Sequence, residues 1–229
     1  MEQRSIAIDG PAGAGKSTLA KMAAKRFGLI YVDTGALYRC IGLYAQRAKV
    51  ASKDEKNVVA LLSGITIEMK YDDQGVQRML LCGEDVTDFI RAPEISIYAS
   101  DVSAMPPVRQ FLLKKQREMA EKYDVIMDGR DIATVVLPSA GLKVFLTADP
   151  DVRAHRRYLE LLEKDASTKY EDVKRDMGMR DKKDSERPVS PLKPAADSII
   201  LDTTDLDLEA SCNALCDLIS ALASRNANK

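Results

Sequence analysis

The sequence is poor in the residues that build metal centres and disulfide frameworks. Among 229 residues it holds one histidine, His155, and four cysteines, none of them paired in a CxxC motif. A single histidine excludes a histidine-rich zinc site and any Ser/His/Asp triad that does not use His155. Cys212 and Cys216 lie four residues apart, and we interpret this spacing as packing on one helical face. Cysteine usage of this kind predicts a protein of the reducing cytoplasm.

An excess of positive charge is missing as well. Lysines and arginines number 34 against 35 aspartates and glutamates, so the formal net charge is −1. Proteins that bind nucleic acid or anionic membranes carry a basic surplus, and we therefore expect no nucleic acid and no membrane as a partner. Apolar runs stay well short of the about 18 residues that a membrane-spanning helix needs. The run at residues 5–8 is too short for the apolar core of a signal peptide.

The order of the apolar segments predicts the fold class. Short apolar strands alternate with helices from the start, as strand 6–9, helix 17–26, strand 29–32 and helix 36–48. The same pattern returns with strands at 125–127, 143–147 and 198–201 and with helical segments at 106–122, 151–185 and 208–223. Alternating strands and helices build parallel sheets with right-handed crossovers. We predict one α/β domain over residues 1–229, a five-stranded parallel sheet flanked by helices.

Residues 63–104 differ from the rest of the chain. Residues 65–70 and 76–82 have the pattern of two strands around the turn Tyr71-Asp72-Asp73-Gln74-Gly75, which predicts a β-hairpin. A hairpin does not belong inside an alternating series of strands and helices. We therefore interpret residues 63–104 as an insertion into the α/β domain.

The most specific local motif follows the first strand. Residues 10–17 match G-x-x-x-x-G-K-[ST] in full and stand between a predicted strand and a predicted helix, as a phosphate-binding loop requires. Its glycines let backbone N–H groups turn toward phosphate oxygens, and the helix adds the positive end of its dipole. Lys16 can reach the β- and γ-phosphates, and Ser17 can bind Mg²⁺. The predicted ATP-binding residues are Gly10, Pro11, Ala12, Gly13, Ala14, Gly15, Lys16, Ser17 and Thr18.

Motifs that define other proteins with this loop are missing. The sequence contains no N-K-x-D tetrapeptide, which GTPases use for guanine, and no L-S-G-G-Q segment of transport ATPases. A compact domain with a hairpin insertion and an arginine-rich helical segment instead indicates a kinase with two movable parts. Such parts close over a substrate and exclude the water that would hydrolyse ATP.

Charged residues follow two of the predicted strands. Asp128-Gly129-Arg130-Asp131 ends the strand at 125–127, and Asp33-Thr34-Gly35 ends the strand at 29–32, with Arg39 about one helical turn later. Ligands of open α/β sheets bind outside the carboxyl ends of the strands, so these positions favour a ligand site. The alternatives are an ordinary ion pair in the loop for residues 128–131 and a helix N-cap for Thr34.

A third charged set lies later in the chain. Arg180, Asp184 and Arg187 are spaced so that a continuous helix would place all three on one face, although Pro188 can end that helix before Arg187. The alternative is a solvent-exposed ion pair on the helix surface. Eleven basic and nine acidic residues share the segment 153–187, so it is no basic tract for nucleic acid.

Taken together these motifs resemble the bacterial cytidylate kinases. The resemblance is carried by residues 9–17, 31–39 and 128–131 and by Arg180-Asp181 followed by Asp184, Arg187 and Pro191-Leu192, in family order over nearly the whole chain. It implies Mg²⁺-dependent transfer of the γ-phosphoryl group of ATP to CMP or dCMP. It also implies that residues 63–104 form the monophosphate-binding insertion and that residues 153–182 form a helical lid. We expect a monomer. Ala133 departs from the family pattern, which often has glycine there.

The resemblance also implies roles for individual residues. The acceptor phosphate would be held by Arg39, Arg130 and Arg187, cytosine would be read by Ser100, Arg109 and Asp131, and the ribose would contact Arg180 and Asp184. Thr34 and Tyr38 would line the substrate pocket, Arg157 would be the lid residue that contacts ATP, and Ser17 and Asp33 would bind the metal. Lys16, Arg130 and Arg157 are the predicted catalytic residues.

This assignment agrees with the chemistry of the reaction. The acceptor phosphate is a dianion that approaches another polyanion, so several guanidinium groups are needed beside it. The acceptor is already a nucleophile, and catalysis reduces to alignment and neutralisation of charge. A carboxylate such as Asp131 can accept from cytosine N4 but would repel the oxygen at position 4 of uracil.

Two other functions remain open from the sequence. The first is a P-loop kinase for another small acceptor, such as UMP or a non-nucleotide metabolite. The second is an ATP-driven regulatory or nucleic-acid-binding switch, which the near-neutral charge disfavours.

Overall fold

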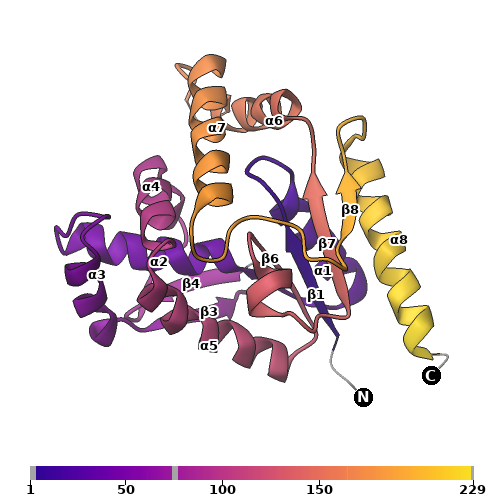
Figure 1. Cartoon of the computed structure of the whole chain (residues 1–229), viewed down its shortest axis with the longest axis horizontal. Coiled ribbons are helices and arrows are strands. Elements are labelled where there is room, and N and C mark those ends of the chain that lie inside the picture. The colour runs from indigo at the N-terminus through magenta and orange to yellow at the C-terminus, as the bar shows by residue number, and fades with distance from the viewer. Residues whose placement is uncertain (1–3, 74–76, 164, 228–229) are drawn as a thin grey trace. The chain divides into compact units, whose positions relative to one another are not determined.

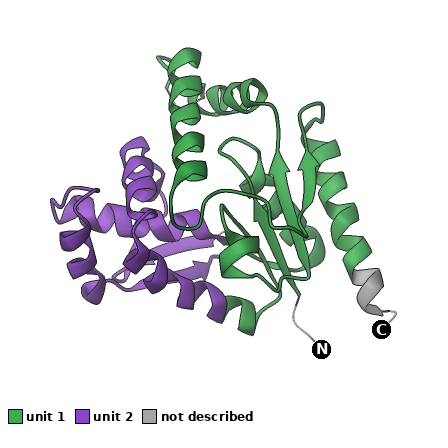
Figure 2. Ribbon diagram, viewed as in Figure 1, with its two compact units in different colours: residues 1–32, 119–229 green, residues 33–118 purple. Residues whose placement is uncertain are grey.

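The computed structural model describes residues 4–73, 77–163 and 165–227 (Figure 1). The chain divides into two compact units (Figure 2). The sheet unit comprises Met1–Val32 and Met119–Lys229, and the hairpin unit comprises Asp33–Glu118. The predicted insertion, residues 63–104, lies inside the hairpin unit, and its role in monophosphate binding stays a prediction.

The sheet unit is built on a five-stranded parallel sheet, which confirms the predicted fold class. The strand order is β2-β6-β1-β7-β8, with β1 at the centre. The strands are β1 (Ser5–Asp9), β2 (Ile30–Asp33), β6 (Val125–Gly129), β7 (Leu142–Thr147) and β8 (Ile199–Asp202). In register, Asp9 of β1 stands opposite Gly129 on one side and Phe145 on the other. The segments that follow β1, β6 and β7 therefore leave the sheet at the same edge.

The helices of this unit are α1 (Lys16–Phe27), α6 (Pro150–Leu162), α7 (Tyr170–Glu186) and α8 (Leu208–Ala227), with a further helical turn at Ile132–Val136. α1 and α8 bury an apolar face against the sheet, whereas α6 and α7 pack against each other through a small core of their own. The main core joins Leu19 and Ala23 of α1 to Ile8 of β1 and to Leu215 of α8. α1 ends at Gly28, whose φ of 66° gives the left-handed cap that glycine adopts without strain.

The cysteines of α8 take part in this packing. Cys212 and Cys216 are both buried, with their sulfur atoms 4.0 Å apart, and all four cysteines are free. The interpretation of this pair as core residues is confirmed. No helix in the described part of the chain is long and apolar enough to span a membrane.

The hairpin unit has its own sheet and its own core. Strands β3 (Ile67–Tyr71) and β4 (Gln77–Leu81) pair antiparallel, which confirms the predicted hairpin, and β5 (Glu84–Asp85) adds to β4. Gln74, Gly75 and Val76 of the predicted turn and strand lie outside the described residues. The remaining elements are α2 (Thr34–Arg47), α3 (Glu55–Leu61), α4 (Pro93–Val102), short turns at Leu62–Gly64 and Phe89–Arg91, and α5 (Pro106–Lys122), which continues into the sheet unit. Their shared core includes Ile41, Val102 and Leu112.

Candidate active site

The loop between β1 and α1 needs its glycines. Gly10 has a φ of 152°, and a Cβ atom there would lie 2.0 Å from the backbone oxygen of Leu146 in β7. Gly13 and Gly15 have φ values of 70° and 87°, in the left-handed region. Other residues would strain these positions, so the sequence motif and the backbone conformation agree.

Lys16 folds back over its own loop. Its side chain is buried, and its Nζ donates a hydrogen bond to the carbonyl oxygen of Pro11 at 2.7 Å. Burial lowers the pKa of Lys16 well below its usual value, and the charges of Arg130 and Arg180 lower it further, against the opposing effect of Asp128 and Asp9. An anion placed in the loop would relieve this unfavourable environment for the ammonium group.

Asp128 joins the phosphate loop to the neighbouring strand. It stands near the end of β6, after the buried residues Val125, Ile126 and Met127. The hydroxyl of Ser17 donates to one carboxylate oxygen at 2.7 Å, and the hydroxyl of Tyr31 donates to the other at 2.9 Å. The sequence predicts a ligand site at residues 128–131 but assigns no role to Asp128 itself. The signal was present, since a charged residue that ends an apolar strand lies at the ligand-binding edge of the sheet.

Asp9 holds the loop after β6 in place. Its carboxylate accepts hydrogen bonds from the backbone N–H groups of Ile132 and Ala133, both at 2.8 Å. Burial raises the pKa of Asp9 to about 6 in spite of these two hydrogen bonds. Ala133 is not among the residues with positive φ, so alanine fits this position without strain.

The motif at residues 128–131 meets α7. Arg130 Nε lies 2.8 Å from Asp184 Oδ2, and Arg187 Nη2 lies 3.5 Å from Asp131 Oδ1. Asp131, Asp184 and Arg187 are buried, which excludes the solvent-exposed ion pair considered from the spacing. Burial alone would raise the pKa of Asp184, but the charges of Arg130 and Arg180 outweigh it and hold that pKa below its usual value. We call Arg130, Asp131, Asp184 and Arg187 the arginine–carboxylate cluster.

The predicted substrate residues of the hairpin unit are arranged around α2. Asp33 is the N-cap of α2 and accepts from the N–H of Ala36 at 2.9 Å, so the alternative reading of Thr34 as the cap is wrong. The Asp33 carboxylate also lies 3.2 Å from Arg91 and 3.6 Å from Arg39. Thr34 itself is buried as the first residue of the helix.

Arg109 and Tyr38 also meet within the hairpin unit. The Arg109 guanidinium lies 5.7 Å from the centre of the Tyr38 ring and donates to the carbonyl of Ser103 at 3.1 Å. Ser100, the other predicted base-reading residue, lies partly buried on α4. The parts assigned to these three residues in reading cytosine stay predictions.

The predicted lid corresponds to α6 and α7. Arg157 makes an ion pair with Glu160 at 2.7 Å on the surface of α6, and its contact with ATP stays a prediction. Arg153, four residues earlier, is buried and reaches the phosphate loop, where its Nη1 donates to the carbonyl of Ala12 at 2.8 Å. Lys164, within the predicted lid, lies outside the described residues.

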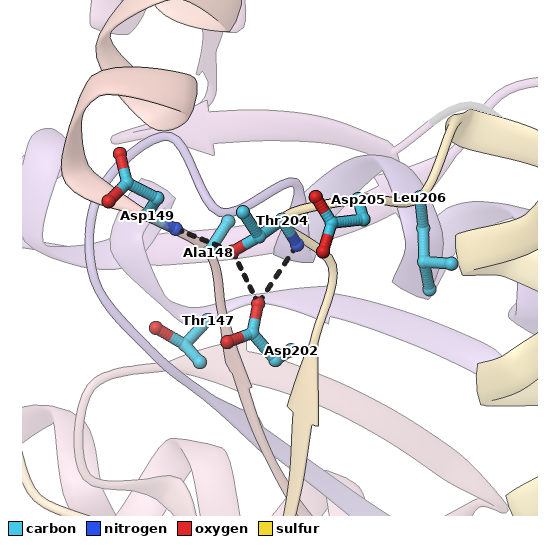
Figure 3. Close-up of a pocket in the computed structure, with 7 residues that line it drawn as sticks. All are labelled: Thr147, Ala148, Asp149, Asp202, Thr204, Asp205 and Leu206. Atoms are coloured by element: carbon cyan, nitrogen blue, oxygen red, sulfur yellow. Dashed lines mark hydrogen bonds between the residues drawn. The ribbon is translucent and has the colours of Figure 1, made fainter.

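A pocket of about 650 Å³ opens at the carboxyl ends of β7 and β8 (Figure 3). It is lined by Thr147, Ala148, Asp149, Asp202, Thr204, Asp205 and Leu206. Thr204 ties the two strand ends together, because its hydroxyl donates to Asp202 at 2.6 Å and accepts from the N–H of Asp149 at 2.8 Å. Arg153 donates to the carbonyl of Ala148 at 2.9 Å and to that of Ala12, so the pocket adjoins the phosphate loop. We had not predicted these residues from the sequence.

The fold and the site together define a class of protein. A phosphate loop between the central strand and the first helix, with a carboxylate on the adjacent strand beside the loop serine, is the arrangement of P-loop nucleotide-binding proteins. A family model described as cytidylate kinase matches residues 6–221. The chain belongs to the cytidylate kinase family.

Individual relatives agree with this membership. A cytidylate kinase of Caldicellulosiruptor bescii is 48% identical over 209 residues, covering 91% of this chain and 92% of that protein. A cytidylate kinase of Lactobacillus gasseri is 48% identical over 214 residues, covering 93% of each. Among solved structures, an uncharacterized protein from Eubacterium ventriosum superposes with a TM-score of 0.50 over 96% of this chain and 99% of that chain at 17% identity, which shows the shared fold alone.

Proposed function

We propose that this protein transfers the γ-phosphoryl group of ATP to CMP and dCMP, giving CDP and dCDP, and that it does so as a cytoplasmic monomer. The observation that carries the proposal is the arginine–carboxylate cluster, which lies at the same edge of the sheet as the phosphate loop. Membership of the cytidylate kinase family supports the choice of acceptor.

The phosphate loop holds the donor. Its backbone N–H groups and the N-terminus of α1 bind the phosphates, and Lys16 leaves Pro11 to contact the β- and γ-phosphate oxygens. Ser17 and Asp128 present a hydroxyl and a carboxylate 2.7 Å apart, hard oxygen ligands of the kind that Mg²⁺ takes together with phosphates. When bound there, Mg²⁺ supplies positive charge beside the phosphate oxygens.

The resemblance implies Asp33 as the carboxylate ligand of the metal, but the geometry favours Asp128 in that role. The carboxylate of Asp33 already caps α2 and faces Arg91 and Arg39. The carboxylate of Asp128 accepts from the hydroxyl of Tyr31 and from that of the loop serine, Ser17, which places it beside the phosphate loop. We propose Asp128 as the ligand of the metal and Asp33 as a support for Arg39.

The pocket beside the loop receives the base of the donor nucleotide. Its volume, about 650 Å³, falls within the range of small-molecule sites. The carboxylates of Asp149, Asp202 and Asp205 line it, and a carboxylate there can accept from the exocyclic amine of adenine.

The cluster holds the acceptor phosphate. Arg130 and Arg187 are permanently charged, and their partners Asp184 and Asp131 fix the direction in which each guanidinium points. Arg39 of the hairpin unit is proposed for the same phosphate. Because the acceptor phosphate is already a nucleophile, the site needs no strong base, and alignment with charge neutralisation accounts for catalysis.

The resemblance of the sequence motifs to the family supports separate assignments for the cytosine ring and for the sugar. We propose that Asp131 accepts from cytosine N4 and that Arg109 and Ser100 donate to the acceptor atoms of the ring. Arg180 and Asp184 are proposed to contact the sugar. We also propose that Thr34 and Tyr38 line the pocket for the substrate and that Arg157 contacts the donor phosphates.

A parallel acceptor assay tests the proposal. The enzyme is supplied with ATP, Mg²⁺ and one of CMP, dCMP, UMP, AMP or shikimate, and ADP formation is followed with chromatography of the product. We expect CMP and dCMP to give the highest kcat/KM. A higher value for UMP or shikimate would support another small-acceptor kinase, and ATP hydrolysis stimulated by nucleic acid alone would support the regulatory switch.

A further inference from the structure

The tip of the phosphate loop is held by two residues with no assigned part in the reaction. Asp181 of α7 accepts a hydrogen bond from the N–H of Ala12 at 3.1 Å, and Arg153 of α6 donates to the carbonyl of Ala12 at 2.8 Å. The two side chains also pair with each other, with Arg153 Nη1 2.5 Å from Asp181 Oδ2. Both peptide groups of Ala12 are therefore tied to the lid helices.

Apolar packing reinforces the same contact. Val173 and Met177 of α7 form a small core with Ala154 of α6, and Ala12 packs against it. A Cβ atom on Gly13 would lie 2.6 Å from Met177 Cε. The loop tip thus rests directly on α7 through side chains on successive turns of that helix.

The same helix reaches the acceptor side. Asp184 follows Asp181 by three residues, so the two carboxylates are neighbours on the helix surface, and Asp184 binds Arg130 at 2.8 Å. A continuous helix, Tyr170–Glu186, therefore contacts the donor loop through Asp181 and the acceptor cluster through Asp184.

We propose that Asp181 and Arg153 are positioning residues that couple donor binding to acceptor binding through α7. A triphosphate fixes the conformation of the loop that carries Ala12, and through Asp181 it fixes the place of α7. Asp184 and its partner Arg130 then stand where the acceptor phosphate needs them. This inference rests on the proposed function and adds to it the residues that link the two substrate sites.

Coupling of this kind is measurable as a ratio of affinities. The dissociation constant for CMP is determined by calorimetry without a donor and with the saturating magnesium complex of adenylyl imidodiphosphate, and the ratio of the two is the coupling factor. Couplings between sites are commonly about 5- to 150-fold, and the reciprocal experiment must give the same factor. We expect a factor of about 5 or more for the wild type.

Asp181→Asn is the decisive variant. The amide is a weaker acceptor for the N–H of Ala12 than the carboxylate, and it no longer carries the charge that pairs with Arg153, so both ties to the phosphate loop are weakened. We expect the coupling factor to fall toward one, with a change of less than about twofold in the affinity for CMP alone. Asp176→Asn is the matched control, because Asp176 is exposed on the same helix and faces only Arg175, at 3.6 Å, among the described ion pairs. It should keep the wild-type factor.

The outcomes separate this inference from the proposed function. Wild-type protein that neither binds nor phosphorylates CMP would remove the proposed function. Wild-type protein that phosphorylates CMP with a coupling factor near one, or an Asp181→Asn variant with the wild-type factor, would overturn the positioning role alone. If Asp181→Asn melts well below the wild type, the coupling factor of Arg153→Lys is measured in its place. Lysine keeps the positive charge, but it lacks the planar guanidinium that donates to the carbonyls of both Ala148 and Ala12.

Discussion

Arg130→Ala removes the guanidinium at the centre of the arginine–carboxylate cluster. If Arg130 binds the acceptor phosphate, the variant loses at least one charge-assisted hydrogen bond in the transition state, which contributes about 1.5–3 kcal/mol. The expected loss in kcat/KM is roughly 10- to 150-fold. CMP and dCMP should lose alike, because both carry the same phosphate.

The same change should also destabilise the fold. Asp184 is 5% exposed and would lose the partner that lies 2.8 Å from it. Breaking a buried ion pair costs about 3–5 kcal/mol, but the charges of Arg180 and Arg187 remain near Asp184 and the Arg130 side chain is 18% exposed. We expect a loss of about 1–3 kcal/mol in the free energy of unfolding. The double variant with Asp184→Ala should lose less than the sum of the two single variants.

Steady-state kinetics with both nucleotides and denaturant unfolding measure the two effects. Arg175→Ala is the control, since Arg175 is 61% exposed and pairs with Asp172 on the surface of α7. It should change the free energy of unfolding by no more than about 0.5 kcal/mol and leave kcat/KM unchanged. An Arg130→Ala variant that loses stability but keeps kcat/KM would refute the phosphate-binding role and leave Arg130 a structural partner of Asp184.

Three further predictions concern the carboxylates of the sheet unit. Asp128→Asn should raise the Mg²⁺ concentration needed for half-maximal activity about tenfold or more, and an unchanged Mg²⁺ titration would contradict its part as a ligand. Asp131→Asn should lower the ratio of kcat/KM for CMP over UMP by about tenfold or more, mainly through CMP; an equal loss on both would assign Asp131 to positioning Arg187. The pKa of Asp9 is raised to about 6, so between about pH 4 and 6 the folded protein binds more protons than the unfolded chain and its stability falls as the pH rises. The difference in the free energy of unfolding between the wild type and Asp9→Asn should therefore fall by about 2–3 kcal/mol across that window. A difference that stays constant would argue against a raised pKa of Asp9.

The sequence predicts the elements of the sheet unit because their signals are local. Apolar runs mark the strands, and the glycines of the phosphate loop stand where positive φ values occur, as at Gly13 and Gly15.

In the hairpin unit, the sequence does not predict helices α3 and α4. α3 is only seven residues long, and α4 begins with Pro93, a residue that breaks a pattern in the middle of a helix but is favourable in its first turn.

The site residues that we did not predict depend on contacts between distant segments. Asp128 lies beside the phosphate loop only because β6 pairs with β1 and brings the Asp128 carboxylate to the hydroxyl of Ser17. Arg153 and Arg157 are chemically identical and four residues apart on one helix, so periodicity cannot tell which of them is buried against the phosphate loop. The three-dimensional packing of α6 and α7 decides in favour of Arg153.

The most direct test of the central claim follows the γ-phosphoryl group itself. Wild-type enzyme is mixed with Mg²⁺, CMP and ATP labelled in the γ-phosphate, and the labelled products are separated by chromatography. The same reaction is run in parallel with the Lys16→Ala variant. We predict that the label appears in CDP, one for each ADP formed, and that Lys16→Ala lowers the rate about 100-fold or more while its melting temperature stays close to that of the wild type. Label released as inorganic phosphate in place of CDP, or a Lys16→Ala rate equal to that of the wild type, would contradict the account.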